Sequence, residues 1–344
     1  MLTFEALRKR LLIGILAGVL VVVAVIFISD AGSIWDALRS FNLRYLPAIL
    51  ALTLANYILR FVKWQYYLRC LNVRGLPTRE SALIFVAGFT MVMTPGKVGE
   101  LLKAWLIRQR TGTSMTVTGP AIFAERLTDG LAMLVLAGVG LLTVQYGWQL
   151  LLLGGCLTAA VIFVVQRERL MLGLIARAGR TRLGAPRVQP MQQLYASTRT
   201  LLSMRPLLVA VTLGVISWLG ECIAYYLILR GLGVPGSTRL LVVAIFVFAA
   251  ATWLGGASML PGGLGVAEVT LTGLLLLSTD NNLISTATAG SATLIMRLAT
   301  LWFGVGIGVI ALSRVSGWLT EEQVPVAVER SSPRQGYERG EGSA

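Results

Sequence analysis

Long apolar runs recur along the chain, separated by short polar and basic segments. The runs 11–28, 45–62, 115–143, 148–165, 207–229 and 284–312 each have the length of a membrane span. A spanning helix needs roughly 20 predominantly apolar residues, and these runs are continuous instead of alternating in period two. The pattern predicts an all-α polytopic membrane protein with about six full transmembrane helices.

Two further segments combine apolar runs with residues that break helices. The first break is Thr94–Glu100, with Pro95, Gly96 and Gly99, and the second is Leu260–Glu268, with Pro261, Gly262, Gly263 and Gly265. Proline removes a backbone donor and glycine adds chain entropy, so neither segment continues a helix. Irregular backbone at membrane depth survives only where protein or a water-filled cavity satisfies it. We predict two broken or re-entrant helical hairpins, 81–108 and 240–279, that line one shared cavity.

The sequences that begin at the two hairpins are similar to each other. When Pro95 is aligned with Pro261, Glu100 and Glu268 both follow the glycines. Arg126-Leu127 after the first hairpin is then matched by Arg297-Leu298 after the second. With alternating spans, the first hairpin opens to the cytoplasm and the second to the outside. Inverted repeats with broken helices at the midplane are the architecture of many secondary transporters.

This pattern divides the chain into five parts. They are a membrane helix and outer linker (1–44), a first repeat (45–165), a basic cytoplasmic loop (166–205), a second repeat (206–315) and a disordered cytoplasmic tail (316–344).

The distribution of charged residues predicts which side of the membrane each part faces. The chain is 56% hydrophobic and 13% charged, with a net charge of +14, and its basic residues cluster between spans. Positive-inside topology explains this pattern better than nucleic-acid binding does. We therefore predict no nucleic-acid partner and a multi-pass protein of the bacterial inner (plasma) membrane with both termini in the cytoplasm.

The basic loop has two interpretations. It holds eight arginines against the single acid Glu168, and Leu170, Met171, Leu174 and Ile175 recur in it at helical spacing. Part of it either lies on the anionic inner leaflet as an amphipathic helix or is an ordinary solvated loop.

The histidine and cysteine content limits the kinds of catalytic and metal sites that the chain can form. Histidine is absent, and the cysteines Cys70, Cys156 and Cys222 are far apart. These facts argue against imidazole-based triads, zinc sites and a disulfide framework, and we predict neither metal nor cofactor. Tryptophans such as Trp64 and Trp148 fall near predicted span ends, where we expect them at the membrane interface.

Ionisable residues inside spans are the candidate site. Each costs roughly 2.5–3.5 kcal/mol on insertion scales, so it needs a partner or a polar cavity. The candidates are Glu100, Glu125, Arg126, Asp129, Glu221, Glu268 and Arg297. They form either structural ion pairs or a substrate cavity with carboxylates available for proton coupling.

The basic candidates differ in their predicted roles. Arg126 and Arg297 are the predicted phosphate contacts, because guanidinium offers a fixed fork of donors and stays charged. Lys97 is a second phosphate contact or an interfacial lysine. Arg60 and Lys63 are inner-leaflet anchors or substrate ligands.

Four motifs carry a resemblance to a known family. They are Arg60-Phe61-Val62-Lys63-Trp64, Thr94-Pro95-Gly96-Lys97-Val98-Gly99-Glu100, Glu125-Arg126-Leu127-Thr128-Asp129 and Pro261-Gly262-Gly263-Leu264-Gly265-Val266-Ala267-Glu268. In this order they resemble the lysylphosphatidylglycerol synthase transmembrane family of flippase-like proteins. The resemblance implies movement of an amphipathic lipid between leaflets. The family's best-known member adds a soluble synthase domain, which this sequence lacks, so we expect no synthase activity.

We interpret the chain as a lipid translocase and not an enzyme. The expected cargo is an anionic phospholipid or a polyprenyl-phosphate-linked lipid. Two alternatives stay open. One is a membrane-embedded glycosyl or acyl transferase, and the other is a scaffold that recruits a lipid-modifying synthase or glycosyltransferase.

Overall fold

The computed structural model describes residues 31–94, 99–140, 148–181, 185–279 and 284–321, and within them the chain is helical without strands. The predicted first span, 11–28, lies outside the described residues. Within these described ranges, five helices are long and apolar enough to cross a membrane: Leu43–Cys70, Met204–Gly231, Thr238–Ala257, Pro261–Ser278 and Thr286–Val315. The prediction of an all-α polytopic membrane protein is confirmed.

The N-terminal half contains the first hairpin. After α2 (Ala31–Arg39) and the short η1 (Leu43–Tyr45), α3 (Leu46–Cys70) runs through the molecule. The hairpin follows as α4 (Thr78–Ala87), η2 (Gly88–Met93) and α5 (Leu102–Thr111). At 1.5 Å per residue, ten-residue helices such as α4 and α5 reach only about 15 Å, half of a bilayer core.

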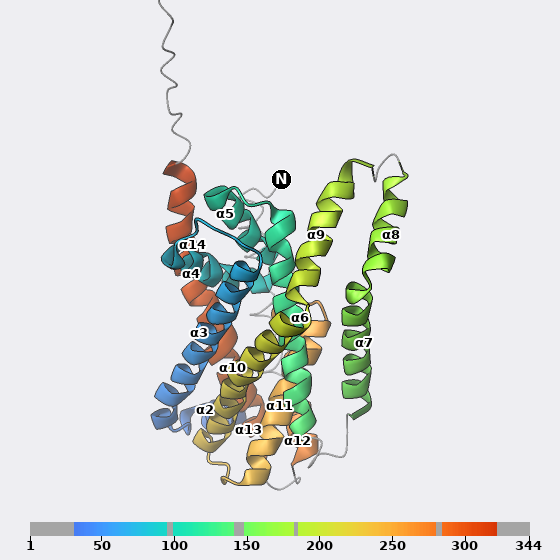
Figure 1. Cartoon of the computed structure of the whole chain (residues 1–344). Helices are drawn as coiled ribbons and strands as arrows, with labels where there is room; N and C mark the ends of the chain where they lie inside the picture. The colour runs from blue at the N-terminus through green and yellow to red at the C-terminus, as the bar shows by residue number, and fades with distance from the viewer. Residues whose placement is uncertain (1–30, 95–98, 141–147, 182–184, 280–283, 322–344) are drawn as a thin grey trace, which may run out of the picture.

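Three long helices and a shorter helical pair follow, separated by one 3₁₀ turn. They are α6 (Met115–Gly140), α7 (Trp148–Gln166), α8 (Glu168–Gly179), η4 (Ala185–Arg187), α9 (Val188–Leu201) and α10 (Met204–Gly231). The predicted basic loop therefore contains two helices, α8 and α9, which rise side by side at one end of the molecule (Figure 1). On α8, Leu170 and Leu174 are exposed, whereas Ile175 is buried.

The second hairpin is formed by α11 (Thr238–Ala257), η5 (Pro261–Gly263) and α12 (Val266–Ser278). Gly263 explains why this break needs glycine. Its φ is +67°, and a Cβ there would lie 3.0 Å from the backbone carbonyl of Gly255 on α11. The close approach of η5 to α11 therefore excludes a side chain at this position.

One bent helix closes the fold. α13 (Thr286–Arg297) passes through a π-helical segment, η6 (Leu298–Trp302), into α14 (Phe303–Glu321). Tyr57 of α3 donates a hydrogen bond to the Thr300 carbonyl oxygen at 2.6 Å, which fastens the π-helical turn to the first repeat. Such turns are frequent at functional sites.

The hairpins lie in different halves of the molecule. In Figure 1, α4 and α5 lie at the upper end beside α14, whereas α11 and α12 lie in the lower half. Their breaks meet, because η2 contacts η5. Separate apolar clusters surround them, one between α10, α11 and their neighbours and the other between α3, α4, α5 and α14. The two hairpins therefore lie toward different ends of the molecule, with η2 and η5 in contact between them (Figure 1).

Candidate functional site

A cavity of about 690 Å³ lies where the two hairpins meet. The first hairpin contributes Val92, Glu100 and Leu101 to its wall, and the second contributes Gly262 and Gly263. Most of the remaining lining residues come from α3, α6, α7, α10, α11, α12, α13, η6 and α14. A cavity shared by both hairpins is therefore present. Pro95, Gly96 and Lys97 lie outside the described residues.

Arg126 of α6 lines this cavity beside the first hairpin. Its Nε and Nη2 atoms each lie 3.0 Å from Oε2 of Glu100, which is buried immediately after the break. The other carboxylates near Arg126 are at longer distances, Glu125 at 3.7 Å and Asp129 at 4.0 Å. Because the Arg126 side chain remains 27% exposed, it is the most accessible of the buried network's cations.

Arg297 of α13 occupies the corresponding place beside the second hairpin. Its Nε donates to Oε1 of Glu268 at 2.5 Å, and its Nη2 donates to the Gly262 carbonyl oxygen at 2.8 Å. The other carboxylate oxygen of Glu268 accepts from the Gly265 amide at 2.7 Å, which caps the start of α12. Each hairpin therefore contributes one glutamate that pairs with a cavity-lining arginine of the helix that follows it.

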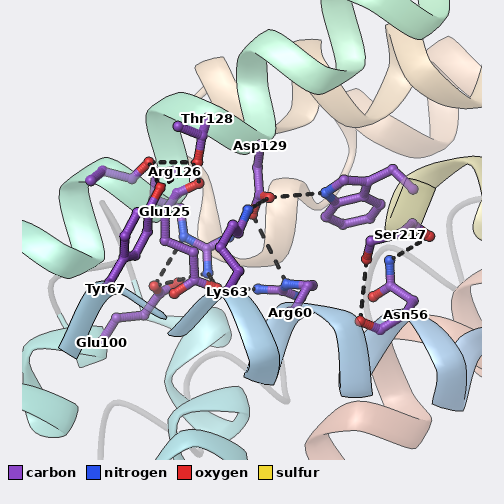
Figure 2. Close-up of polar contacts among 12 residues, drawn as sticks. Asn56, Arg60, Lys63, Tyr67, Glu100, Glu125, Arg126, Thr128, Asp129 and Ser217 are labelled. Atoms are coloured by element: carbon purple, nitrogen blue, oxygen red, sulfur yellow. Dashed lines mark hydrogen bonds and ion pairs between the residues drawn. The ribbon is translucent and has the colours of Figure 1, made fainter. Parts of the chain in front are cut away.

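A buried network of alternating charges lies behind Arg126 (Figure 2). Glu125 accepts from Arg60 through Oε1 and from Lys103 through Oε2, both at 2.8 Å. Lys63 Nζ lies 2.5 Å from Oδ1 of Asp129. Buried charges are tolerated when they are paired and hydrogen-bonded, so this network joins α3, α5 and α6.

Some atoms of the network have no hydrogen-bond partner within the described residues. They are Arg60 Nε, Glu100 Oε1 and Asp129 Oδ2, and all three atoms are buried. Arg60, Glu100 and Asp129 all line the cavity. Because an unsatisfied buried polar atom is costly, these groups are suited to bind water or a polar ligand.

A second polar contact joins α3 to α10. Asn56 Nδ2 donates to the Ser217 carbonyl oxygen at 3.1 Å, and Ser217 Oγ donates to the Asn56 carbonyl oxygen at 3.2 Å (Figure 2). One turn along each helix, Thr53 Oγ1 donates to Oε2 of Glu221 at 3.3 Å. Glu221 also lines the cavity.

The structure changes the interpretation of three residues on α3. Arg60 and Lys63 are 7% and 0% exposed and are paired with acids of α6, so the prediction of inner-leaflet anchors is wrong. Arg60 lines the cavity, and Lys63 instead holds Asp129. The expectation that Trp64 lies at the membrane interface is also wrong, because it is fully buried. Span ends mark the interface only where no other element covers them.

Sequence reasoning missed Lys103. Its side chain crosses Gly88 of η2 and lies over the Trp64 ring at 4.7 Å on its way to Glu125. The only signal in the sequence was a lysine within the apolar stretch 101–107, which forms the second arm of the first hairpin. From sequence alone, a lysine in such a half-helix is equally consistent with a side chain that extends to the membrane–water interface.

Comparison with known proteins identifies the family. Residues 15–308 match the family described as the lysylphosphatidylglycerol synthase TM region. The chain belongs to this family. All the cavity residues named above lie inside the matched range.

Membrane proteins of a methanogen are similar to this family member. A UPF0104 membrane protein of Methanothermobacter thermautotrophicus is 25% identical over 335 residues, which cover 90% of this chain and 96% of that protein. A second UPF0104 membrane protein of the same organism is 31% identical over 125 residues, or 36% and 35% of the two chains. These relatives support a multi-pass membrane protein of the lysylphosphatidylglycerol synthase TM family.

Proposed function

We propose that this chain is a translocase that moves an anionic lipid between membrane leaflets. The observation that carries the proposal is the single cavity that presents both Arg126 and Arg297, from the helices that follow the first and the second hairpin. Guanidinium groups bind phosphate through parallel hydrogen bonds. A headgroup phosphate would compete with Glu100 for Arg126 and with Glu268 for Arg297.

The cavity rim suits the lipid tails. Leu101, Phe123 and Met259 line the cavity and are also 37%, 47% and 63% exposed at the surface. They come from α6 and from both hairpins, and we propose that the lipid tails leave the cavity between these three apolar side chains. A volume of about 690 Å³ fits the range of sites for small ligands, which is enough for a headgroup while the tails stay in the bilayer.

The proposed cycle follows from this arrangement. The headgroup enters at one hairpin, exchanges the carboxylate on one arginine for its phosphate, and passes to the other arginine as the two repeats rock. Alternating access of this kind is the general mechanism of inverted-repeat transporters. The bacterial inner membrane and cytoplasmic termini are part of this proposal.

Leaflet exposure in proteoliposomes tests the proposal. Vesicles would carry a fluorescent anionic glycerophospholipid, a polyprenyl phosphate or a zwitterionic phospholipid as a trace component. We expect wild-type protein to move one anionic class faster than protein-free vesicles, and Arg126→Ala to abolish that movement. Arg199→Ala, which removes an exposed ion pair with Glu168 on α8, is the matched control and should retain transport. Equal rates with and without protein for all three lipids contradict the proposal.

The rim makes a separate prediction about transport. Phe123→Gln places a polar amide at the apolar opening and should slow movement of a long-chain lipid several-fold. Ile58→Gln is the control, because Ile58 is 63% exposed on α3 and does not line the cavity. Equal transport rates of the two variants would show that the tails do not pass this opening.

A further inference from the structure

Glu221 differs from the other carboxylates of the cavity region. Glu100, Glu125, Asp129 and Glu268 each lie within 3.0 Å of an arginine or lysine nitrogen. Glu221 is 1% exposed and forms no ion pair within the described residues. An isolated ionised carboxylate in apolar surroundings is costly, and such a group is neutralised by taking up a proton.

Few hydrogen-bond donors surround the Glu221 carboxyl group. Thr53 supplies one hydroxyl bond at 3.3 Å, at the long end for O–H donors. The Asn56 amide and the Ser217 hydroxyl, which are also buried, each bond to the other's backbone carbonyl. The only hydrogen bond to Glu221 in the described part of the chain is therefore the one from Thr53.

Some of the helices packed against α10 place ionisable residues in the cavity with Glu221, and others do not. Helix α11 contributes Phe248, Thr252 and Trp253 to the cavity, none of them ionisable, and η1 and α9 contact the two ends of α10. On α10 itself, Cys222 and Tyr225 are buried beside Glu221. The ionisable residues that share the cavity with Glu221 are Tyr57 and Arg60 from α3, Arg126 and Asp129 from α6, Glu100 from the first hairpin and Arg297 from α13.

Arg60 connects Glu221 to the charge network. Its guanidinium carbon lies 5.5 Å from the centre of the Trp218 ring, one helical turn before Glu221 on α10. Its Nη2 is bonded to Glu125, while its Nε has no hydrogen bond within the described residues. Arg60 therefore lies between α10 and α6 with a donor to spare.

We propose that Glu221 is a proton-binding site that couples a proton gradient to the movement of lipid. Protonated Glu221 leaves Arg60 bonded to Glu125, as in this structure. When Glu221 releases its proton to water in the cavity, its negative charge attracts Arg60 toward α10 and loosens the contact between α3 and α6. Uptake of a proton from the opposite side restores the first state. The coupling step rests on the proposed translocase function, whereas proton binding at Glu221 does not.

Infrared difference spectroscopy of the reconstituted full-length protein tests proton binding directly. A protonated carboxyl group has a C=O stretching band that its ionised form lacks. We expect wild-type protein at neutral pH to show one such band that disappears at alkaline pH, and Glu221→Gln to lack it. Glu268→Gln is the matched control, because Glu268 is also buried but is paired with Arg297, and it should keep the band.

Transport in the same vesicles tests the coupling. An imposed gradient of one pH unit is worth a factor of up to about ten in a proton-coupled step. Wild-type protein should respond to the gradient, and Glu221→Gln should lose this response while unfolding at the wild-type temperature.

The outcomes separate the two proposals. Identical infrared spectra of wild type and Glu221→Gln overturn the proton site, as does a Glu221 carboxylate band that shifts with Na⁺ and not with pH. Lipid movement in which wild type and Glu221→Gln respond equally to the gradient overturns the coupling. If the Glu221 band is present but no lipid moves under any condition, the translocase function fails while the proton site stands.

Discussion

At the scale of single residues, the buried pair of Lys63 and Asp129 shows how the site is held together. Lys63 is fully buried, and its ammonium group bonds to an acid that also accepts from Trp218 Nε1 at 3.1 Å. Removing one member of a buried ion pair leaves an uncompensated charge. Lys63 therefore stabilises the position of Asp129 at the cavity.

This pairing predicts a large effect of Lys63→Met on stability. We expect the free energy of unfolding in detergent to fall by about 3–5 kcal/mol, because the Asp129 carboxylate loses its closest cation. The double variant Lys63→Met/Asp129→Leu should recover most of that loss. Arg199→Ala, which breaks an ion pair with side chains 45% and 49% exposed, should change it by less than about 1 kcal/mol. Equal losses for Lys63→Met and Arg199→Ala would show that the buried pair is not structural.

The sequence identified most of these charged residues but not their partners. Glu125, Asp129 and Arg60 stand out because ionisable residues are rare in apolar runs. That Glu125 bonds to Lys103 depends on how α5 packs against α6, and residues 103 and 125 approach each other only after the first hairpin folds back. Long-range packing of this kind leaves no local pattern in the sequence.

At the scale of elements, the second break is set by backbone geometry. Gly263 combines a positive φ with contact to the backbone of Gly255, so an L side chain is both strained and obstructed there. The composition of the break predicted that a helix would stop, but not which glycine was indispensable. That distinction comes from the close approach of η5 to α11.

The geometry predicts opposite results for two glycines of the second hairpin. Gly263→Ala should lower the free energy of unfolding by about 1–3 kcal/mol, because strained backbone at φ of +67° costs energy and Gly255 cannot move away easily. Gly273→Ala lies within α12, where a Cβ meets no atom within 4 Å, and should be neutral or stabilising by up to about 1 kcal/mol. Chemical denaturation of both variants in the same detergent measures the difference. Similar losses would remove Gly263 as the determinant of the break.

Helix positions follow hydropathy closely, but full spans and hairpin arms are harder to tell apart. The run 207–229 corresponds to α10 (Met204–Gly231), and the run 148–165 corresponds to α7 (Trp148–Gln166). Among the described residues, the helices long and apolar enough to span include both arms of the second hairpin but not α7. The π-helical segment Leu298–Trp302 had no signal in the sequence, and its Thr300 carbonyl oxygen accepts a hydrogen bond from Tyr57 of the distant helix α3.

At the scale of the whole molecule, the two hairpins open toward opposite ends. This arrangement requires that the ends of α4 and α5 face one side of the membrane and that those of α11 and α12 face the other. In an otherwise cysteine-free chain, single cysteines at positions 78 and 113 should react with a membrane-impermeant reagent from one side. Cysteines at positions 237 and 279 should react only from the other side. Labelling of all four from the same side would contradict an inverted repeat.

The proposed transport requires that Arg126 and Arg297 both act on a lipid that passes through the shared cavity. The most direct measurement is the lipid translocation rate in proteoliposomes for wild type, Arg126→Gln, Arg297→Gln and the double variant, each checked for its unfolding temperature. Charge-assisted hydrogen bonds are worth about 1.5–3 kcal/mol, so each folded single variant should lose about 10- to 100-fold in rate. Folded single and double variants that move lipid at the wild-type rate would contradict the claim.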